Sequence, residues 1–188
     1  MYSIVIIMRT LYLSALLFLA AATYANPPQI IDITSKVNFG HHVKEKRKVD
    51  IIVIHSTRCL EGDPYDVMAA VNVFRSYNVA SHYMIGRNGM IYRLVAEKDV
   101  AFHAGKSVLP QTGRKFLNGS SIGIELLNSP TDAPTKEQYT ALVQLVNDIK
   151  TRYAIQYIVG HSDIASDRKT DPWLFDWKQF NFLLNKQL

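Results

Sequence analysis

The chain has 188 residues, of which 48% are hydrophobic and 20% are charged, and its formal net charge is +5. This composition excludes an intrinsically disordered chain and is typical of one globular domain with a full core. Its one cysteine, Cys59, excludes an internal disulfide, so the fold must be stabilised by its core even outside the cytoplasm.

Residues 1–25 are predicted to be a signal peptide. Residues 11–22 form an uncharged apolar run, Arg9 supplies the preceding positive charge, and the small residues before Ala25 resemble a cleavage site. A membrane anchor is the alternative, because residues 4–7 are also apolar and the combined run approaches spanning length. We expect cleavage, hence a periplasmic or secreted protein with no stable membrane insertion afterwards.

Residues 26–48 are predicted to be an N-terminal arm that precedes the main domain at 49–188. The arm has few regularly spaced apolar residues and ends in the basic run 44–48, which we interpret as solvated; binding to an anionic polymer is the alternative. Removing Arg9 lowers the count of Lys and Arg from 21 to 20 against 16 Asp and Glu, which leaves a charge of +4. This excess is modest, and we expect no nucleic-acid partner.

Two apolar runs predict buried strands that end in a histidine. Residues 51–54 are a β-branched run, typical of a central strand covered on both faces, and they are followed by His55. Residues 157–159 lead to His161 in the same way. Both imidazoles are therefore expected at the edge of a sheet, where the ligand sites of α/β proteins gather.

The elements between and after these strands follow a regular pattern. We predict a helix over 66–77, followed by a hairpin with strands 81–85 and 90–95 around Asn88-Gly89. A strand over 121–127, which contains Glu125, comes next. Two helices then follow, one that begins at the capping box of Thr135 and Gln138 and a short one from Asp176. Strands interspersed with helices predict a single α/β domain with a central mixed β-sheet flanked by helices.

The stretch 159–173 contains several side chains that could bind a metal or take part in catalysis. It contains His161, Lys169 and Asp171, and with His55 it offers two imidazoles and one carboxylate as ligands. Three protein ligands leave the fourth tetrahedral position open for water, as a catalytic zinc site requires, so we hypothesise one Zn²⁺ per chain. The alternative is structural, since a single histidine at a strand end is often a hydrogen-bonded core residue and an aspartate before Pro172 can organise a turn.

Five blocks of the sequence resemble one known family, the zinc-dependent N-acetylmuramoyl-L-alanine amidases, which share their fold with peptidoglycan recognition proteins and phage amidases. The blocks are Val53-Ile-His55-Ser, Ser81-His-Tyr, Phe102-His-Ala-Gly105, Ser121-Ile-Gly-Ile-Glu125, and Gly160-His-Ser-Asp with Arg168-Lys-Thr-Asp-Pro172. The resemblance runs from about residue 49 to residue 177. It implies a mixed sheet with a groove for muropeptides, with His55, His161 and Asp171 as zinc ligands and Glu125 and Lys169 as catalytic residues.

The chemistry of an amidase gives each of these residues a role. Zinc lowers the pKa of bound water to ~7 and polarises a carbonyl oxygen. A carboxylate beside that water can take its proton and deliver it to the leaving nitrogen, the role expected of Glu125. Lys169 can stabilise the oxyanion of the tetrahedral intermediate. The resemblance thus implies hydrolysis of the bond between N-acetylmuramic acid and L-alanine in peptidoglycan or muropeptides.

The substrate-binding residues are less constrained by the sequence. His103 either contacts substrate, which we favour, or holds the loop that follows it. Arg87, Arg114 and Lys115 are candidates for binding a carboxylate of the stem peptide. One departure from the family pattern is Trp173-Leu174, which stands where many relatives carry Gly-Pro and which could reshape the wall of the groove.

Two other functions remain as alternatives. A peptidoglycan-binding module without catalysis would not need the five residues His55, His161, Asp171, Glu125 and Lys169. A zinc peptidase acting within the stem peptide could use the same metal chemistry. We favour a monomer.

Overall fold

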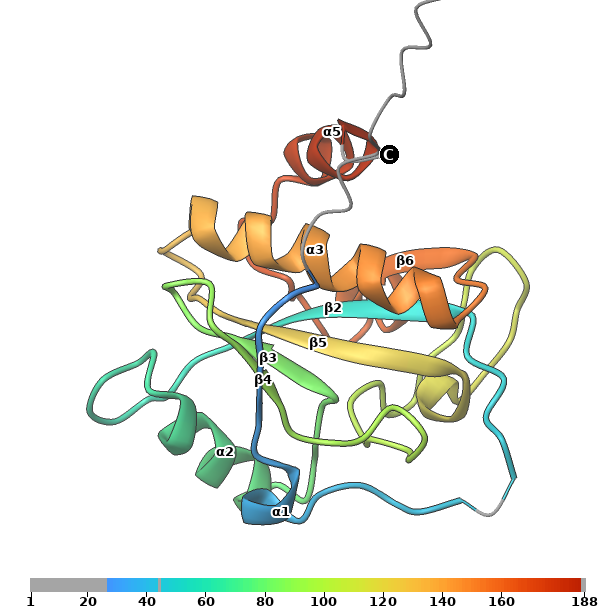
Figure 1. Ribbon diagram of the computed structural model, residues 1–188, viewed down its shortest axis with the longest axis horizontal. Helices are drawn as coiled ribbons and strands as arrows, with labels where there is room; N and C mark the ends of the chain where they lie inside the picture. Colours follow the sequence, from blue (N-terminus) through green and yellow to red (C-terminus); the bar gives the residue numbers. More distant parts are fainter. Residues whose placement is uncertain (1–26, 44, 187–188) are drawn as a thin grey trace, which may run out of the picture.

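The computed structural model describes residues 27–43 and 45–186, and the predicted signal peptide lies outside these ranges. Six strands form one sheet in the order β1-β4-β3-β5-β2-β6 (Figure 1). Neighbouring strands run parallel except in the β3–β4 hairpin. The strands are β1 (Ile30–Asp32), β2 (Ile51–Thr57), β3 (Tyr83–Ile85), β4 (Ile91–Arg93), β5 (Ser121–Leu127) and β6 (Tyr157–Gly160). The predicted mixed sheet is confirmed.

Helices cover both faces of this sheet. Helix α3 lies along one face with α5 outside it, and α1 and α2 lie on the opposite side (Figure 1). The helices are α1 (Thr34–Val37), α2 (Val67–Ser76), the 3₁₀ helix η1 (Leu117–Ser120), α3 (Lys136–Arg152), α4 (His161–Ile164) and α5 (Trp177–Lys186). The predicted capping box of α3 is confirmed, because Gln138 N–H donates to Thr135 Oγ1 at 3.1 Å and Thr135 N–H to Gln138 Oε1 at 3.0 Å.

The two faces of β2 are buried differently. Ile52 and Ile54 pack with the residues of α3 in the largest core cluster. Ile51 and Val53 point to the other face, where they belong to a cluster formed by loop residues 104–117 and α4. Since successive side chains of a strand alternate, His55 follows Val53 onto this second face. The sheet therefore presents His55 where loops, rather than the long helix α3, cover it.

Gln138 fastens α3 to the carboxyl ends of two strands. Its buried side-chain amide donates to the carbonyl oxygens of Ile85 and Leu127, the last residues of β3 and β5, at 3.0 Å each. The oxygen of the same side-chain amide accepts from the backbone N–H of Thr135 in the capping box. One side chain thus aligns the edge of the sheet at which functional residues are expected.

Replacing Gln138 with leucine is expected to lower the free energy of unfolding by about 1–3 kcal/mol, because two buried carbonyls lose their donor. Urea unfolding followed by circular dichroism would measure the change. Gln144→Leu, on the half-buried side of the same helix, is the matched control and should change stability by less than about 0.5 kcal/mol. Equal stability of the two variants would contradict this role of Gln138.

The N-terminal arm contributes a strand to the sheet, and the basic run that we interpreted as solvated is exposed at Glu45, Lys46 and Lys48 but not at Arg47. Its strand β1 forms the edge of the sheet beside β4, and the Arg47 side chain is buried. The Arg47 guanidinium donates to five backbone carbonyls, those of Glu97, Asp99, Asn118, Gly119 and Ser121. The burial of Arg47 could not be predicted from the basic run, because only the tertiary structure brings the five carbonyls together.

Within the described ranges, none of the helices has the length and apolar character needed to cross a membrane.

Candidate metal centre

Three predicted ligands converge on one point at the carboxyl end of β2. Nδ1 of His55 lies 3.0 Å from Nδ1 of His161, and Oδ2 of Asp171 lies 3.2 Å from Nδ1 of His161 and 3.4 Å from Nδ1 of His55. All three residues are buried. The three atoms thus form a nearly equilateral triangle of lone-pair donors.

The geometry of this triangle fits a tetrahedral metal ion. Donors that each lie ~2.0–2.1 Å from such an ion are about 3.3–3.4 Å from one another, close to the three distances observed. Burial lowers the pKa of His55 to about 4, against the opposing effect of the Asp171 carboxylate, so its ring is neutral at neutral pH. Burial alone would raise the pKa of Asp171, but the polar contacts of its carboxylate with the rings of His161 and His55 hold that pKa below its usual range. The residues therefore offer two imidazoles, of which that of His55 is neutral, and one carboxylate.

Local backbone features bring the third ligand to the other two. His161 follows β6 directly and begins α4, rather than only ending a strand. The backbone carbonyl of Asp171 accepts from the N–H of Ser162 at 2.7 Å. Gly160 allows this close approach, because a Cβ there would lie 2.7 Å from Cδ of Pro172. The glycine of the motif thus makes room for the segment that carries the aspartate.

Glu125 stands beside the centre because of strand register. It is the direct partner of His55 in the parallel β2–β5 ladder, so both side chains emerge on the same face. Burial raises the pKa of Glu125 well above its usual range, the Asp171 carboxylate adds to this, and the charge of Lys169 opposes it. The structure thus brings Glu125 close to the ligand set, with Lys169 near enough to influence its charge.

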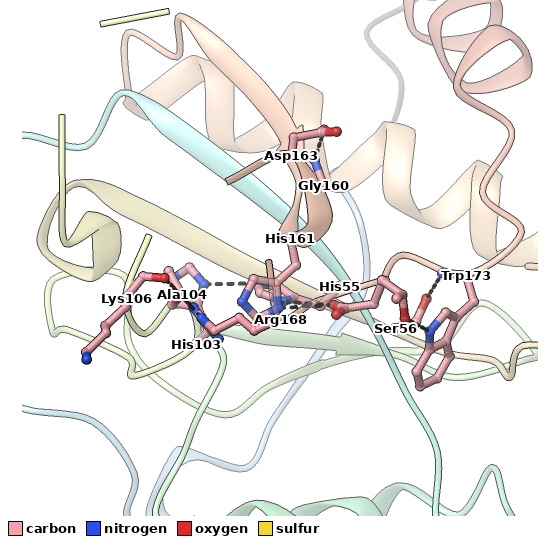
Figure 2. Close-up of polar contacts among 12 residues, drawn as sticks. His55, Ser56, His103, Ala104, Lys106, Gly160, His161, Asp163, Arg168 and Trp173 are labelled. Atoms are coloured by element: carbon pink, nitrogen blue, oxygen red, sulfur yellow. Dashed lines mark hydrogen bonds and ion pairs between the residues drawn. The ribbon is translucent and has the colours of Figure 1, made fainter. Parts of the chain in front are cut away.

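Hydrogen bonds from Arg168 connect the loop after His103 to the loop that carries Lys169. Its guanidinium donates to the carbonyl of Ala104 at 2.7 Å and to that of Lys106 (Figure 2). Gly105 lies between these carbonyls with a φ of +56°, and a Cβ there would lie 3.0 Å from Nη2 of Arg168. Arg168 lies within the motif before Asp171, but it is not among the functional residues predicted from the sequence.

Two of the predicted carboxylate-binding residues are held by other protein groups. Arg114 forms a two-fold ion pair with Asp50 at 2.8 and 3.0 Å, at the start of β2 and roughly 16 Å along the strand from His55. Arg87 lies at the end of β3, with its guanidinium 4.8 Å from the centre of the Tyr65 ring and a hydrogen bond of 2.8 Å to the carbonyl of Ala133. The structure does not bring Arg114 to the centre.

The remaining two predicted substrate-binding residues differ in exposure. Lys115 is exposed on the loop before η1. His103 is buried, with its Nδ1 at 3.0 Å from Nε2 of His55 (Figure 2). Its Nε2 lies 3.1 Å from Oγ of Ser121. Burial and the neighbouring histidines hold the pKa of His103 well below its usual range, so this ring is neutral too. Contact with substrate stays a prediction for these two residues, as it does for the two arginines.

A groove of about 680 Å³ is lined by Thr57 and Trp173, which follow His55 and Asp171 by two residues each. Trp173 contributes to its wall, and the backbone N–H of Trp173 donates to Oγ of Ser56 at 2.9 Å, next to His55 (Figure 2). Thr57, Arg58 and the exposed side chains of Leu60 and Tyr77 also line it. Trp173, one of the two residues that depart from the family pattern, therefore lies in the wall of a groove next to the ligands.

The sequence matches one family model, described as N-acetylmuramoyl-L-alanine amidase, over residues 45–173. It is 40% identical to the 1,6-anhydro-N-acetylmuramyl-L-alanine amidase AmpD of Escherichia coli K12 over 112 residues, which are 58% of this chain and 60% of that protein. It is 35% identical to the N-acetylmuramoyl-L-alanine amidase AmiD of the same organism over 151 residues, 70% of this chain and 52% of that protein. The chain thus spans little more than half the length of these relatives.

Solved structures show the same fold. A selenomethionine derivative of AmpD superimposes with a TM-score of 0.63 and 30% identity, covering 86% of this chain and 96% of that one. Escherichia coli AmiD, in complex with its substrate anhydro-N-acetylmuramic acid-L-Ala-D-γ-Glu-L-Lys, gives a TM-score of 0.63 and 33% identity over 74% of this chain and 58% of that one. The Apis mellifera peptidoglycan recognition protein PGRP-SA, at 16% identity and a TM-score of 0.56 over 81% of this chain and 94% of that one, shares the fold alone.

Proposed function

The chain belongs to the N-acetylmuramoyl-L-alanine amidase family, as the sequence resemblance predicted, and from this membership we propose that it is a zinc-dependent peptidoglycan amidase. It would hydrolyse the amide bond between N-acetylmuramic acid and the L-alanine of the stem peptide, in peptidoglycan or in muropeptides released from it. The substrate reported for AmiD, an anhydro-muropeptide, supports this substrate class.

The observation that carries this proposal is the convergence of three ligand atoms beside a buried carboxylate. Nδ1 of His55, Nδ1 of His161 and Oδ2 of Asp171 lie within 3.4 Å of one another, and Glu125 is the ladder partner of His55. These three ligands would hold one Zn²⁺ per chain. When bound, the ion would supply Lewis acidity, which lowers the pKa of water and polarises a carbonyl.

Glu125 would act as the general base. Its buried position next to His55 suits it to take a proton from the attacking water, and its raised pKa suits it to keep that proton until the leaving nitrogen needs it. A raised pKa matters because a carboxyl with its ordinary acidity would release the proton to solvent at neutral pH.

Lys169 would stabilise the negative charge that develops on the carbonyl oxygen. Its positive charge favours the ionised form of Glu125 and disfavours protonation of His55, as expected of a cation placed at the reacting centre. The hydrogen bonds from the neighbouring Arg168 to the carbonyls of Ala104 and Lys106 would keep the loop that carries Lys169 in place while substrate binds.

Peptidoglycan as substrate also accounts for the location that we propose, the periplasm or the exterior of a bacterial cell, reached through a signal peptide at residues 1–25. That segment lies outside the described residues, so the proposal depends on its sequence and on the substrate class.

Mass spectrometry of the products from a defined disaccharide-tetrapeptide would test the proposed function. The zinc-loaded protein should release free disaccharide and intact tetrapeptide. Cleavage inside the peptide would instead indicate a zinc peptidase. Unchanged substrate that co-purifies with the protein would indicate a binding module without catalysis.

Removing the metal with a chelator is expected to stop product release while the chain stays folded. Three separate apolar clusters pack against this sheet, so its stability does not depend on the ion. Activity and far-ultraviolet circular dichroism, measured together before and after chelation and again after zinc is restored, would check this. Cooperative unfolding on chelation would mean that the ion is structural as well.

A further inference from the structure

A row of hydrogen bonds leads from the candidate metal centre into the loop before β5. Nε2 of His55 lies 3.0 Å from Nδ1 of His103 (Figure 2). Nε2 of His103 lies 3.1 Å from Oγ of Ser121. The Ser121 hydroxyl then donates to the carbonyl of Leu117 at 2.7 Å. The rings of His55 and His103 meet edge to face, with their centres 5.1 Å apart.

The hydroxyl of Ser121, at the end of this row, determines which atom donates and which accepts in each of its hydrogen bonds. Because Ser121 gives its only hydroxyl proton to Leu117, its oxygen accepts from Nε2–H of His103. A neutral imidazole with its proton on Nε2 carries a lone pair on Nδ1, so His103 accepts from Nε2–H of His55. His55 then has no proton on Nδ1, the atom that faces His161 and Asp171.

We propose that His103 is a positioning residue, which fixes the tautomer and the ring orientation of His55 so that its Nδ1 is presented to the metal. This inference rests on the metal-binding part of the proposed function. A ligating histidine commonly donates its second N–H to a carboxylate, a backbone carbonyl or water. Here the acceptor is a second neutral imidazole, and its own orientation is set by Ser121.

The backbone around His103 is built to hold its ring in this place. The backbone N–H groups of His103 and Ala104 both donate to Oδ1 of Asn118, at 3.1 and 2.7 Å. The ring lies directly over Gly123 of β5, where a Cβ would come within 2.5 Å of Cγ and 2.7 Å of Nδ1 of His103. The glycine in the middle of an otherwise apolar strand thus leaves the space that this imidazole fills.

Only one of the two candidate histidine ligands is oriented in this way. Nε2 of His161 is buried and meets no hydrogen-bond partner among residues 27–43 and 45–186. The effect of replacing His103 should therefore be transmitted through His55 alone.

Zinc affinity of the whole mature chain, measured by competition with a chromophoric chelator, tests the role of His103. His103→Leu removes the acceptor and should raise the zinc Kd by about 10–100-fold. His103→Asn keeps an oxygen at the place of Nδ1 and should restore the Kd to within about threefold of the wild type. His82→Leu is the matched control: this histidine is also buried, its ring centre is 5.7 Å from that of His103, and its polar contacts are with Arg47, Gly123 and Asp99 rather than with a ligand. Its zinc Kd should stay at the wild-type value.

Nuclear magnetic resonance of ¹⁵N-labelled imidazoles gives a second readout that a merely structural role would not change. In the zinc-loaded wild type and in His103→Asn, His55 should carry a slowly exchanging proton on Nε2 and none on Nδ1. If His103→Leu does not fold, Ser121→Ala removes the group that orients His103 and should broaden or lose the same proton signal, with a smaller rise in Kd.

Three outcomes would overturn the inference: an unchanged zinc Kd in folded His103→Leu, a Kd for His103→Asn as weak as that of the leucine variant, or an unaltered His55 proton signal in Ser121→Ala. Any of these with product release intact would leave the proposed function standing. A wild-type chain that binds no zinc would remove both.

Discussion

Replacing Glu125 with glutamine is expected to lower kcat of the zinc-loaded protein by about 10²–10⁴-fold. Glutamine keeps the shape of the side chain beside His55 but cannot take up a proton, so attack by water loses its base. Because Glu125 is not one of the three converging ligands, the variant should still bind one zinc ion per chain. Product release from the disaccharide-tetrapeptide and metal content by atomic emission would measure the two effects on the same sample.

Glu137→Gln is the matched control for this experiment. Glu137 is exposed in the first turn of α3, and the same loss of charge there should leave kcat unchanged. Near-normal turnover of Glu125→Gln would exclude Glu125 as the base, and loss of zinc from that variant would instead make it part of the metal site.

Asp171→Ala is expected to lose both stoichiometric zinc and activity. Asp171 supplies the only carboxylate of the triangle, and without its negative charge the two imidazoles hold a divalent cation weakly. The loss in zinc affinity should exceed the roughly 10–100-fold that removal of an outer hydrogen-bond partner costs. Metal content after gel filtration with equimolar zinc would measure it.

Asp167→Ala removes an exposed carboxylate from the same loop and should leave zinc content and activity at the wild-type level. Stoichiometric zinc in Asp171→Ala would take Asp171 out of the ligand set. Circular dichroism of both variants would show that they remain folded.

Much of this fold could be predicted because local signals agree with the tertiary structure. The β-branched run before His55, the Asn88-Gly89 turn and the capping box of Thr135 with Gln138 each specify an element by themselves, and each is present. The approach of His55 to His161 could also be predicted, because the carboxyl ends of the neighbouring parallel strands β2 and β6 meet at one edge of the sheet, whereas Asp171 reaches them from the segment after α4.

Other features depend on register and packing, which the sequence pattern does not determine. The pairing of Glu125 with His55 requires one alignment of β2 and β5, and a shift by one residue would turn Glu125 to the opposite face. The ion pair of Arg114 with Asp50 joins residues far apart in the chain. The burial of His103 over Gly123 likewise depends on where a loop returns to the sheet.

The burial of Arg47 divides the basic run into positions of different tolerance. Glu45, Lys46 and Lys48 are exposed, so exchange of their charges should alter the long-range electrostatic field of the surface and little else. At position 47 a lysine would conserve the charge but not the planar fork, and its three donors could not serve five carbonyls. Of the four described residues in this run, three should therefore tolerate a change of charge, whereas Arg47 is constrained by the shape of its side chain rather than by the sign of its charge.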